Sequence, residues 1–407
     1  MGIARGGNVL DSCVKVKKVM AICIATALCF QRLSMAVGSI FWGIAIACFL
    51  FLLYKSHQNG DLIERAINFK NYYKVIAFML LCFVPSVIFS VDVKTSAKAF
   101  VEMWVYRLMP FFMVTLFIEN KKWLKNIFMV FVITTCLDCL VAAYQVYGMH
   151  VSRGWGLGGH TLNLASLLSI MTPMYAVILF DDAFSKKLKH LCTVALVCCV
   201  LGLIAGKSRG AWLTLGIILP LVSAYYVVKS KKAMVICLII VLAIGAGFAS
   251  SKQYRQRLVS IGNVTTDVSN ADRIRVWKSC FNMISDYPVT GVGLGNFREV
   301  YNKGHYRLKT TVQDLPHSHN NYLQLWSEGG TVGFIGFMAM SLFVLFTNLR
   351  MWLKTKSPFY LMIWGPWLGF MIFGMFDLII DHSAITKVWW FMFGALLVLA
   401  KGLEKSS

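Results

Sequence analysis

The sequence predicts an all-α, polytopic membrane protein with about twelve transmembrane helices and one large, partly helical loop outside the cytoplasm. Hydrophobic residues make up 58% of the 407 residues, charged residues only 14%, and the mean hydropathy is +0.66. This composition excludes an ordinary water-soluble protein. Apolar stretches of roughly 15–22 residues, enough to cross about 30 Å of hydrocarbon as a helix, recur from end to end.

The apolar stretches define the expected spans. We place them near 19–31, 33–54, 72–90, 99–118, 124–147, 162–180, 190–206, 211–228, 233–250, 331–349, 359–376 and 384–400. The first two are separated only by Gln31 and Arg32, so a single segment 19–54 is the alternative, and it would move every later loop to the other side. The basic N-terminus resembles a signal peptide, but the further spans that follow at once favour an uncleaved first helix.

The basic residues indicate topology. A formal charge of +22 would suggest a nucleic-acid partner for a soluble domain, but here Lys and Arg form short clusters between apolar runs, so no nucleic acid is expected. The clusters lie at both termini and in every second connection, at 55–74, 121–125, 186–189, 229–232 and 350–356. By the positive-inside rule both termini are cytoplasmic. The chain then divides into helices 1–9 (1–250), a large periplasmic loop (251–330) and helices 10–12 (331–407).

The twelve cysteines fall almost entirely inside apolar runs, where cysteine behaves as a small hydrophobic residue. Cys280 alone lies in the long polar loop, so that loop has no disulfide framework. Cys136 and Cys139 form a CxxC inside an expected span, and there packing is favoured over a redox or metal role.

The unusual polar clusters emerge on the non-cytoplasmic face, in 147–161, 206–210, 251–330 and 377–387. The first contains Arg153 in a glycine-rich loop. The second is a tight hairpin that holds Arg209 near the hydrocarbon, where an unpartnered arginine costs up to about 2.5–3.5 kcal/mol. As an alternative, Lys207 and Arg209 extend to phospholipid head groups.

Three charges lie inside expected spans, namely Glu102, Arg107 and Asp138. A buried pairing among them and a role in substrate binding are both open.

The large loop contains an amphipathic helix near 270–284. A capping Asn or Asp is followed by an apolar stripe, flanked by Arg273, at helical spacing: Ile274, Trp277, Phe281 and Ile284. The GxGxG within 288–297 has no surrounding strand, turn and helix, so a glycine-rich turn is favoured over a dinucleotide site.

The segment 317–333, HSHNNYLQLWSEGGTVG, concentrates groups able to transfer protons. An imidazole is suited to general base work, while His317 is expected to orient its neighbour or bind water. Gln324 and Glu328 either shape the helix entrance or contact sugar. Zinc needs three or four ligands, and the sequence has no HExxH and no paired CxxC, so no metal is expected.

Arginines on the same face, Arg153, Arg209 and Arg273, suit bidentate phosphate binding. Together with an imidazole base at a membrane surface, they suggest transfer from a lipid phosphate donor, with arginines taking the place of Mg²⁺.

Four segments resemble the O-antigen ligase and O-antigen polymerase superfamily: SRGAW at 208–212, ADRIRVWK at 271–278, PVTGVGLGNF at 288–297 and the segment 317–333. His319-Asn320, nine residues, then Gly330-Thr-Val-Gly333 is the spacing typical of the ligases. The resemblance implies a glycosyltransferase-C-like fold and inverting, metal-independent transfer without a cofactor. The donor would be an undecaprenyl pyrophosphate-linked glycan in the inner membrane, and the acceptor a lipid A-core sugar.

The resemblance also implies roles for individual residues. His319 matches the histidine that activates the acceptor hydroxyl, while Arg209 and Arg273 match arginines that hold the pyrophosphate. Arg153 stands where a further family arginine is expected. The remaining expected site residues, in supporting or substrate-binding roles, are His317, Asn320, Lys207 and Glu328.

Three other functions compete with the ligase. A polymerase of the same superfamily joins two lipid-linked repeats, and a protein O-oligosaccharyltransferase uses a protein acceptor. A transporter would place its functional charges and broken helices near the bilayer midplane, whereas the polar clusters here lie at one surface.

Overall fold

The computed structural model describes residues 3–235, 237–238, 252–260, 268–303, 306–307 and 314–404. Within these ranges the regular elements are helices, and no strand occurs. Their bounds are α1 Ile3–Phe30, α2 Met35–Asn59, α3 Leu62–Ile67, α4 Lys70–Ile88, α5 Val93–Phe100, the π-helical turn η1 Val101–Tyr106, α6 Arg107–Phe117, α7 Lys121–Tyr147, α8 Thr161–Phe180, α9 Lys186–Gly206, α10 Arg209–Lys229, α12 Lys252–Val259, α13 Val268–Asp286, α14 Phe297–Asn302, α15 Asn321–Thr355, α16 Pro358–Phe373 and α17 Ser383–Glu404.

The prediction of a polytopic, all-helical membrane protein is confirmed. In the described part of the chain nine helical segments are long and apolar enough to cross a membrane: α2, α4, the continuous α5–η1–α6, α7, α8, α9, α10, α15 and α17. Each coincides with an expected span. The shorter apolar α16 matches 359–376, and 19–31 lies within α1. Most of the expected span 233–250 lies outside the described residues, so the count of about twelve stays a prediction.

The first apolar region folds as two helices and not as one segment. A turn at 31–33 separates α1 from α2, and Ser34 begins α2 by accepting a hydrogen bond from the backbone N–H of Val37. In this turn Arg32 forms a buried ion pair with Asp138 of α7. The ion pair attaches the α1–α2 hairpin to the next part of the bundle.

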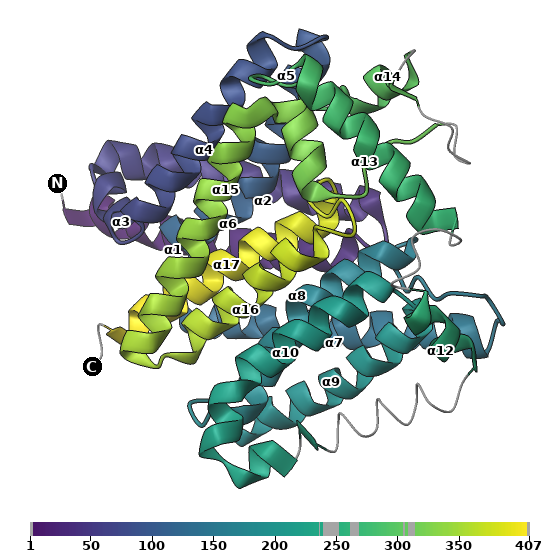
Figure 1. Ribbon diagram of the computed structural model, residues 1–407. Coiled ribbons are helices and arrows are strands. Elements are labelled where there is room, and N and C mark those ends of the chain that lie inside the picture. The colour runs from purple at the N-terminus through teal and green to yellow at the C-terminus, as the bar shows by residue number, and fades with distance from the viewer. Residues whose placement is uncertain are drawn as a thin grey trace.

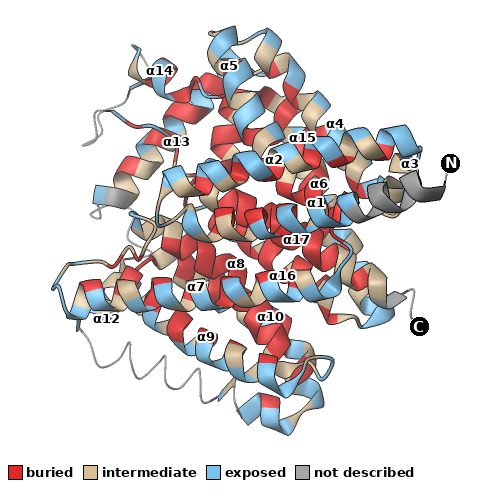
Figure 2. Cartoon of the chain, turned by 180° about the vertical axis from the view of Figure 1, so that it is seen from behind, coloured by how far each residue is buried: buried red, intermediate tan, exposed pale blue. Residues whose placement is uncertain are grey.

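The core of the bundle is α8, which is buried along most of its length and contacts α9, α10, α16 and α17. Figure 2 shows this concentration of buried residues around α8, with exposed surfaces on the outer helices. A cluster of tryptophan and phenylalanine rings, Trp367, Phe370, Trp389, Trp390 and Phe393, locks α16 against α17.

Helix α15 packs closely against α4 because glycines line the contact. A Cβ on Gly336 would lie 2.5 Å from the Cβ of Cys82, and one on Gly333 would lie 2.7 Å from the ring of Phe83. Small residues allow two helices to approach closely within a membrane. The contact fixes α15, whose N-terminal part carries most of the motif 317–333.

Helix α15 starts ten residues earlier than the expected span 331–349, and it bends at Gly330. The backbone of Gly330 has φ 63° and ψ −177°, and a Cβ there would lie 2.2 Å from the carbonyl oxygen of Val289. At the bend the glycine-rich turn enters: Val292 N–H donates to Ser327 O at 2.9 Å, and Gly293 N–H donates to Glu328 O at 2.9 Å. The predicted glycine-rich turn is present, and it packs against α15.

The amphipathic helix is confirmed as α13, but its buried stripe is rotated from the prediction. Val276, Cys280 and Met283 are buried together with the predicted Ile284, whereas the predicted Phe281 is 54% exposed. Arg273 precedes Val276 and Cys280 by three and seven residues, so it lies on the inward face instead of flanking it. This rotation directs Arg273 toward the bundle.

The connections that carry the unusual polar residues gather at one end of the molecule. Figure 1 shows α12, α13 and α14 on the side away from both termini. Gly154 N–H donates to Ala205 O at 3.0 Å, and Asn321 N–H donates to Gly374 O at 2.7 Å. The first bond joins the loop after α7 to the end of α9, and the second joins the start of α15 to the segment after α16.

Candidate active site

The loop 317–320 is held rigidly at the start of α15. Asn320 caps the helix, because its side-chain oxygen accepts hydrogen bonds from Tyr322 N–H at 2.9 Å and Leu323 N–H at 3.0 Å. Its amide group donates to Met375 O at 3.2 Å. Asn320 therefore joins α15 to the segment that follows α16.

The backbone of Ser318 is fixed from both sides. Its N–H donates to the side chain of Gln324 at 2.8 Å, and its carbonyl accepts from the indole of Trp277 at 3.1 Å. The next residue, His319, then adopts a left-handed conformation with φ 54°, which is uncommon outside glycine. The imidazole of His319 thus projects from a strained turn whose backbone is fixed.

His317 is placed to orient His319. The N–H of His319 donates to Nδ1 of His317 at 3.3 Å, and the two rings meet edge to face with centroids 4.2 Å apart. Burial, with the neighbouring His319, lowers the pKa of His317 to about 4, so its Nδ1 remains an acceptor near neutral pH. The geometry fits the predicted orienting role and provides no contact with the arginines.

Asp377 is the second partner of His319. Its Oδ1 lies 3.3 Å from Nδ1 of His319, and its side chain is 1% exposed. Burial alone would raise the pKa of Asp377, but the hydrogen bond and charge of His319 outweigh burial and lower it. A carboxylate at Nδ1 favours the tautomer with its proton there, which leaves Nε2 to accept a proton from a substrate.

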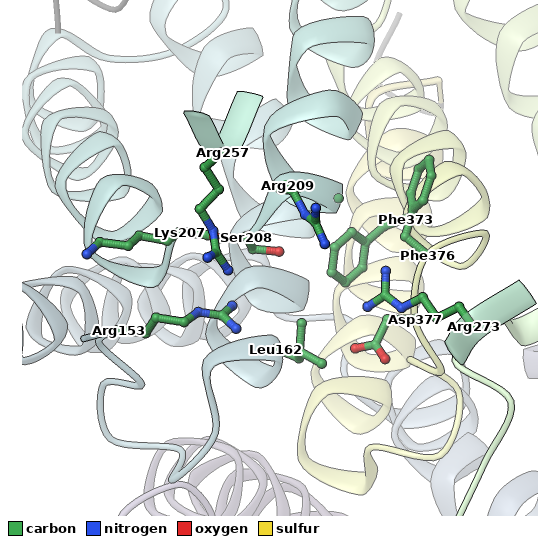
Figure 3. Close-up of a pocket in the computed structure, with 11 residues that line it drawn as sticks. Arg153, Leu162, Lys207, Ser208, Arg209, Arg257, Arg273, Phe373, Phe376 and Asp377 are labelled. Carbon is green, nitrogen blue, oxygen red and sulfur yellow. The ribbon is translucent and has the colours of Figure 1, made fainter. Parts of the chain in front are cut away.

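Asp377 also lines a cavity of about 90 Å³. We call it the basic pocket; Figure 3 shows the residues around it. Five cations and one carboxylate line it: Arg153, Lys207, Arg209, Arg257, Arg273 and Asp377. The structure therefore brings together all three arginines predicted from the sequence, together with the predicted Lys207.

Backbone carbonyls orient the guanidinium groups. Nε of Arg153 donates to Gly206 O at 3.0 Å, and Nε of Arg257 donates to Lys207 O at 2.9 Å. Nη1 of Arg209 donates to the carbonyl and hydroxyl oxygens of Ser260, at 3.1 and 2.8 Å, and its Nη2 donates to Asn270 Oδ1 at 3.2 Å. A guanidinium has five donors in a rigid plane, so such anchoring sets its direction.

The cations of the basic pocket repel one another, which lowers the pKa of two of them. Burial and then the charges of Arg257, Arg209 and Arg273 lower the pKa of Arg153 to about 10. Burial, followed by Arg257 and Arg153, also lowers the pKa of Lys207. Repulsion of this kind is relieved by a bound anion, so the pocket suits a multiply charged group such as pyrophosphate.

Two predicted residues lie away from the basic pocket. Glu328 is 3% exposed, and its Oε1 accepts from Phe297 N–H at 3.0 Å. Gln324 is engaged by Ser318. Both contacts fit the expected role of shaping the entrance to the helix. Glu328 is not among the residues that line the basic pocket.

The intramembrane charges do not pair among themselves, contrary to one of the two expectations. Asp138 pairs with Arg32, and its Oδ1 also accepts from Leu157 N–H at 2.7 Å. Arg107 donates to Ile380 O at 2.7 Å and to Asp381 at 3.2 Å, and Glu102 lies 3.9 Å from Lys98. The partners of Asp138 and Arg107 come from turns and loops, where the sequence offers no periodicity, whereas Lys98 precedes Glu102 by four residues along the same helical segment.

His317, His319 and Asp377 each offer one ligand atom, and these atoms lie within 4.8 Å of one another. Three protein ligands are the usual number in a catalytic zinc site. The cations lining the basic pocket oppose a divalent ion beside Asp377. The expectation of no metal stays a prediction.

Two residues of the site were missed from the sequence, Asp377 and Arg257. Asp377 begins the segment 377–387, which was expected on the same face as His319, so an acid directly after an apolar run was an available indication. Arg257 lies in KQYRQRL, among several exposed cations, and no motif distinguishes it.

A family model described as O-antigen ligase matches residues 194–338. This match supports membership of the O-antigen ligase and polymerase superfamily. Proteins of this superfamily are glycosyltransferase-like enzymes of polysaccharide assembly that act on lipid-linked substrates in membranes. The matched range contains Arg209, Arg257, Arg273 and His319, and it excludes Arg153 and Asp377.

A curated protein that is similar to this chain is an uncharacterized protein of Haemophilus influenzae. It is 25% identical over 171 residues, which cover 39% of this chain and 43% of the relative. The chain thus spans less than half of the relative's length.

Proposed function

We propose that this protein is an O-antigen ligase. It transfers a polysaccharide from undecaprenyl pyrophosphate to a sugar hydroxyl of the lipid A-core, at the periplasmic face of the bacterial inner membrane, with both termini in the cytoplasm. The main support is Asp377, which lines the basic pocket and also lies 3.3 Å from Nδ1 of His319. A base and a pyrophosphate site thereby meet at one end of a helical membrane bundle.

The donor's pyrophosphate occupies the basic pocket in this proposal, and its anomeric carbon faces His319. Nε2 of His319 accepts the proton of the acceptor hydroxyl while the hydroxyl oxygen attacks the anomeric carbon from the face opposite the pyrophosphate. The new glycosidic bond forms, the bond from carbon to pyrophosphate oxygen breaks, and the configuration inverts. The proton remains on His319, where Asp377 stabilises the imidazolium.

Negative charge grows on the pyrophosphate as its bond to carbon breaks. Interactions that are stronger in the transition state than in the ground state accelerate the reaction. Fixed guanidinium groups supply such interactions without reorganising. Arg153, Arg209, Arg257 and Arg273 therefore replace the metal ion in this proposal, and the protein needs no cofactor.

Membership of the superfamily is equally compatible with an O-antigen polymerase or a protein O-oligosaccharyltransferase. The spacing from His319-Asn320 to Gly330 and Gly333 favours the ligase. In the other two enzymes the pocket and the base keep these roles and only the acceptor changes. An experiment that distinguishes the three enzymes must therefore vary the acceptor.

The test incubates purified protein with a lipid-linked glycan in EDTA, with lipid A-core, without it, or with a protein acceptor, and follows the product by gel. Glycan on the core supports the ligase. Longer lipid-linked chains without core would identify a polymerase, and glycan on the protein would identify the third enzyme. Activity that is absent in EDTA and returns with a divalent ion would overturn the metal-independent mechanism.

A further inference from the structure

A second cavity lies between α1 and α7, on the outer surface of the bundle. Its volume is about 490 Å³, within the roughly 300–1,000 Å³ of ligand pockets. No residue of the basic pocket lines it. Figure 2 shows α1 and α7 on the face turned toward the viewer. We call this cavity the α1–α7 groove.

The length of the groove corresponds to one leaflet of a bilayer. Its lining on α1 runs from Lys18 to Phe30, about 18 Å along a helix at 1.5 Å per residue, compared with about 15 Å for half of the hydrocarbon core. Apolar lining residues are exposed, including Ile22 at 54% and Val130 at 40%. In a helix that lies in a membrane, such residues face lipid.

The two ends of the groove differ in charge. At one end Lys18 and Lys122 lie with Trp123 and Asn126, while no acidic residue belongs to the lining. Both lysine side chains are exposed. Beyond Phe30, the ion pair of Arg32 with Asp138 joins α1 and α7 again. The groove is therefore apolar along its length and positive at its open end.

We propose that the α1–α7 groove binds one anionic glycerophospholipid, with an acyl chain between the two helices and the head-group phosphate at Lys18 and Lys122. Basic pockets between transmembrane helices bind anionic head groups, and a tryptophan beside them suits the level of the interface. A zwitterionic lipid has the same phosphate, but its own ammonium group repels the two lysines, so it should bind more weakly. The site is separate from the proposed transfer reaction.

Phosphatidylglycerol is the probe for the test, with phosphatidylethanolamine of the same acyl chains as the comparison. The full-length protein in detergent is titrated with each lipid, and bound lipid is counted by native mass spectrometry. We expect tighter binding of phosphatidylglycerol, and a loss of about fivefold for each of Lys18→Gln and Lys122→Gln, the change that corresponds to about 1 kcal/mol per cation. Lys125→Gln is the matched control, since Lys125 is an exposed lysine of the same helix outside the groove.

The acyl-chain part of the proposal has its own variant. Thr26→Trp fills the groove from α1, and Thr26→Ala leaves it open. We expect only the tryptophan variant to lose the lipid, with both variants keeping wild-type melting temperatures. The proposal would be overturned if the wild type bound the two lipids equally. It would also be overturned if the double variant Lys18→Gln/Lys122→Gln, or Thr26→Trp, bound phosphatidylglycerol as tightly as the wild type.

Discussion

The basic pocket and the α1–α7 groove both offer cations, but in different ways. In the pocket, arginines are held by backbone carbonyls and sit among one another's charges. In the groove, the exposed side chains of Lys18 and Lys122 lie at one end of an apolar lining. Planar, oriented donors select the shape of an anion, whereas flexible ammonium groups select only its charge. The difference separates a site suited to chemistry from a site suited to lipid retention.

Removing the base should have the largest effect on the basic pocket and none on the α1–α7 groove. His319→Ala should leave the protein inserted and folded but lower the transfer rate by about 10²–10⁴-fold, the usual range for a general base. Initial rates with lipid-linked glycan and core measure the effect, and an unchanged melting temperature shows that the fold is intact. Wild-type turnover in this variant would exclude His319 as the base, and phosphatidylglycerol binding should stay at the wild-type level.

Removing an oriented cation should have the next largest effect. Arg209→Ala is expected to lower kcat by about 10²–10³-fold, as for the loss of one donor to a developing oxyanion. Arg209→Lys keeps the charge but loses the contacts to Ser260 and Asn270, and should recover only part of the rate. Equal rates for the lysine variant and the wild type would show that charge alone matters in the pocket.

Asp377 should act through His319. In Asp377→Asn the amide no longer stabilises the imidazolium or selects the same tautomer, so kcat should fall by at least about tenfold with little change in KM. The pH profile of kcat should shift as well, which a purely structural role would not produce. A rise in KM alone would place Asp377 in substrate binding instead.

Arg257 should contribute less, since four other cations line the same pocket. Arg257→Gln keeps a donor near Lys207 O and is expected to raise the KM for the lipid-linked donor by roughly tenfold, the loss of about 1.4 kcal/mol. Arg255→Gln on the same helix, where Arg255 is exposed and outside the pocket, is the matched control. Equal KM values in the two variants would remove Arg257 from the site.

The smallest expected effect concerns acid. The folded state lowers the pKa of His317 to about 4 from an ordinary value near 6.5, so the stability that its neutral form provides is present above pH 6.5 and lost as the pH falls toward 4. The melting temperature should therefore drop by a few degrees between pH 7 and pH 5. His317→Asn, which keeps an acceptor for His319 N–H and does not titrate there, should drop less. An identical drop would exclude His317 as its source.

Periodicity and charge predicted much of the fold, because a membrane imposes strong rules on both. The expected spans coincide with α2, α4, α7 and the later helices. The rotation of α13 was missed because Trp277 and Phe281 are as apolar as Val276 and Cys280, so hydropathy alone does not choose the inward face. The long start of α15 was missed because its first turns are polar yet buried.

The candidate site was predictable where local motifs exist. His319, Arg209 and Arg273 stand in short segments that resemble a family, and Arg153 was found by its expected face. Asp377 pairs with His319 across 58 residues, and a single acid after a span has no spacing that announces its partner. The pairing of Arg32 with Asp138 across more than a hundred residues was hidden for the same reason.

The ion pair between Arg32 and Asp138 also orders the biogenesis of the protein. Arg32 leaves the ribosome long before Asp138, so the first hairpin enters the membrane with a charge that has no partner until α7 is synthesised. A buried charge left alone costs several kcal/mol. The ion pair can therefore form only after α7 has been synthesised, and the hairpin docks through it late.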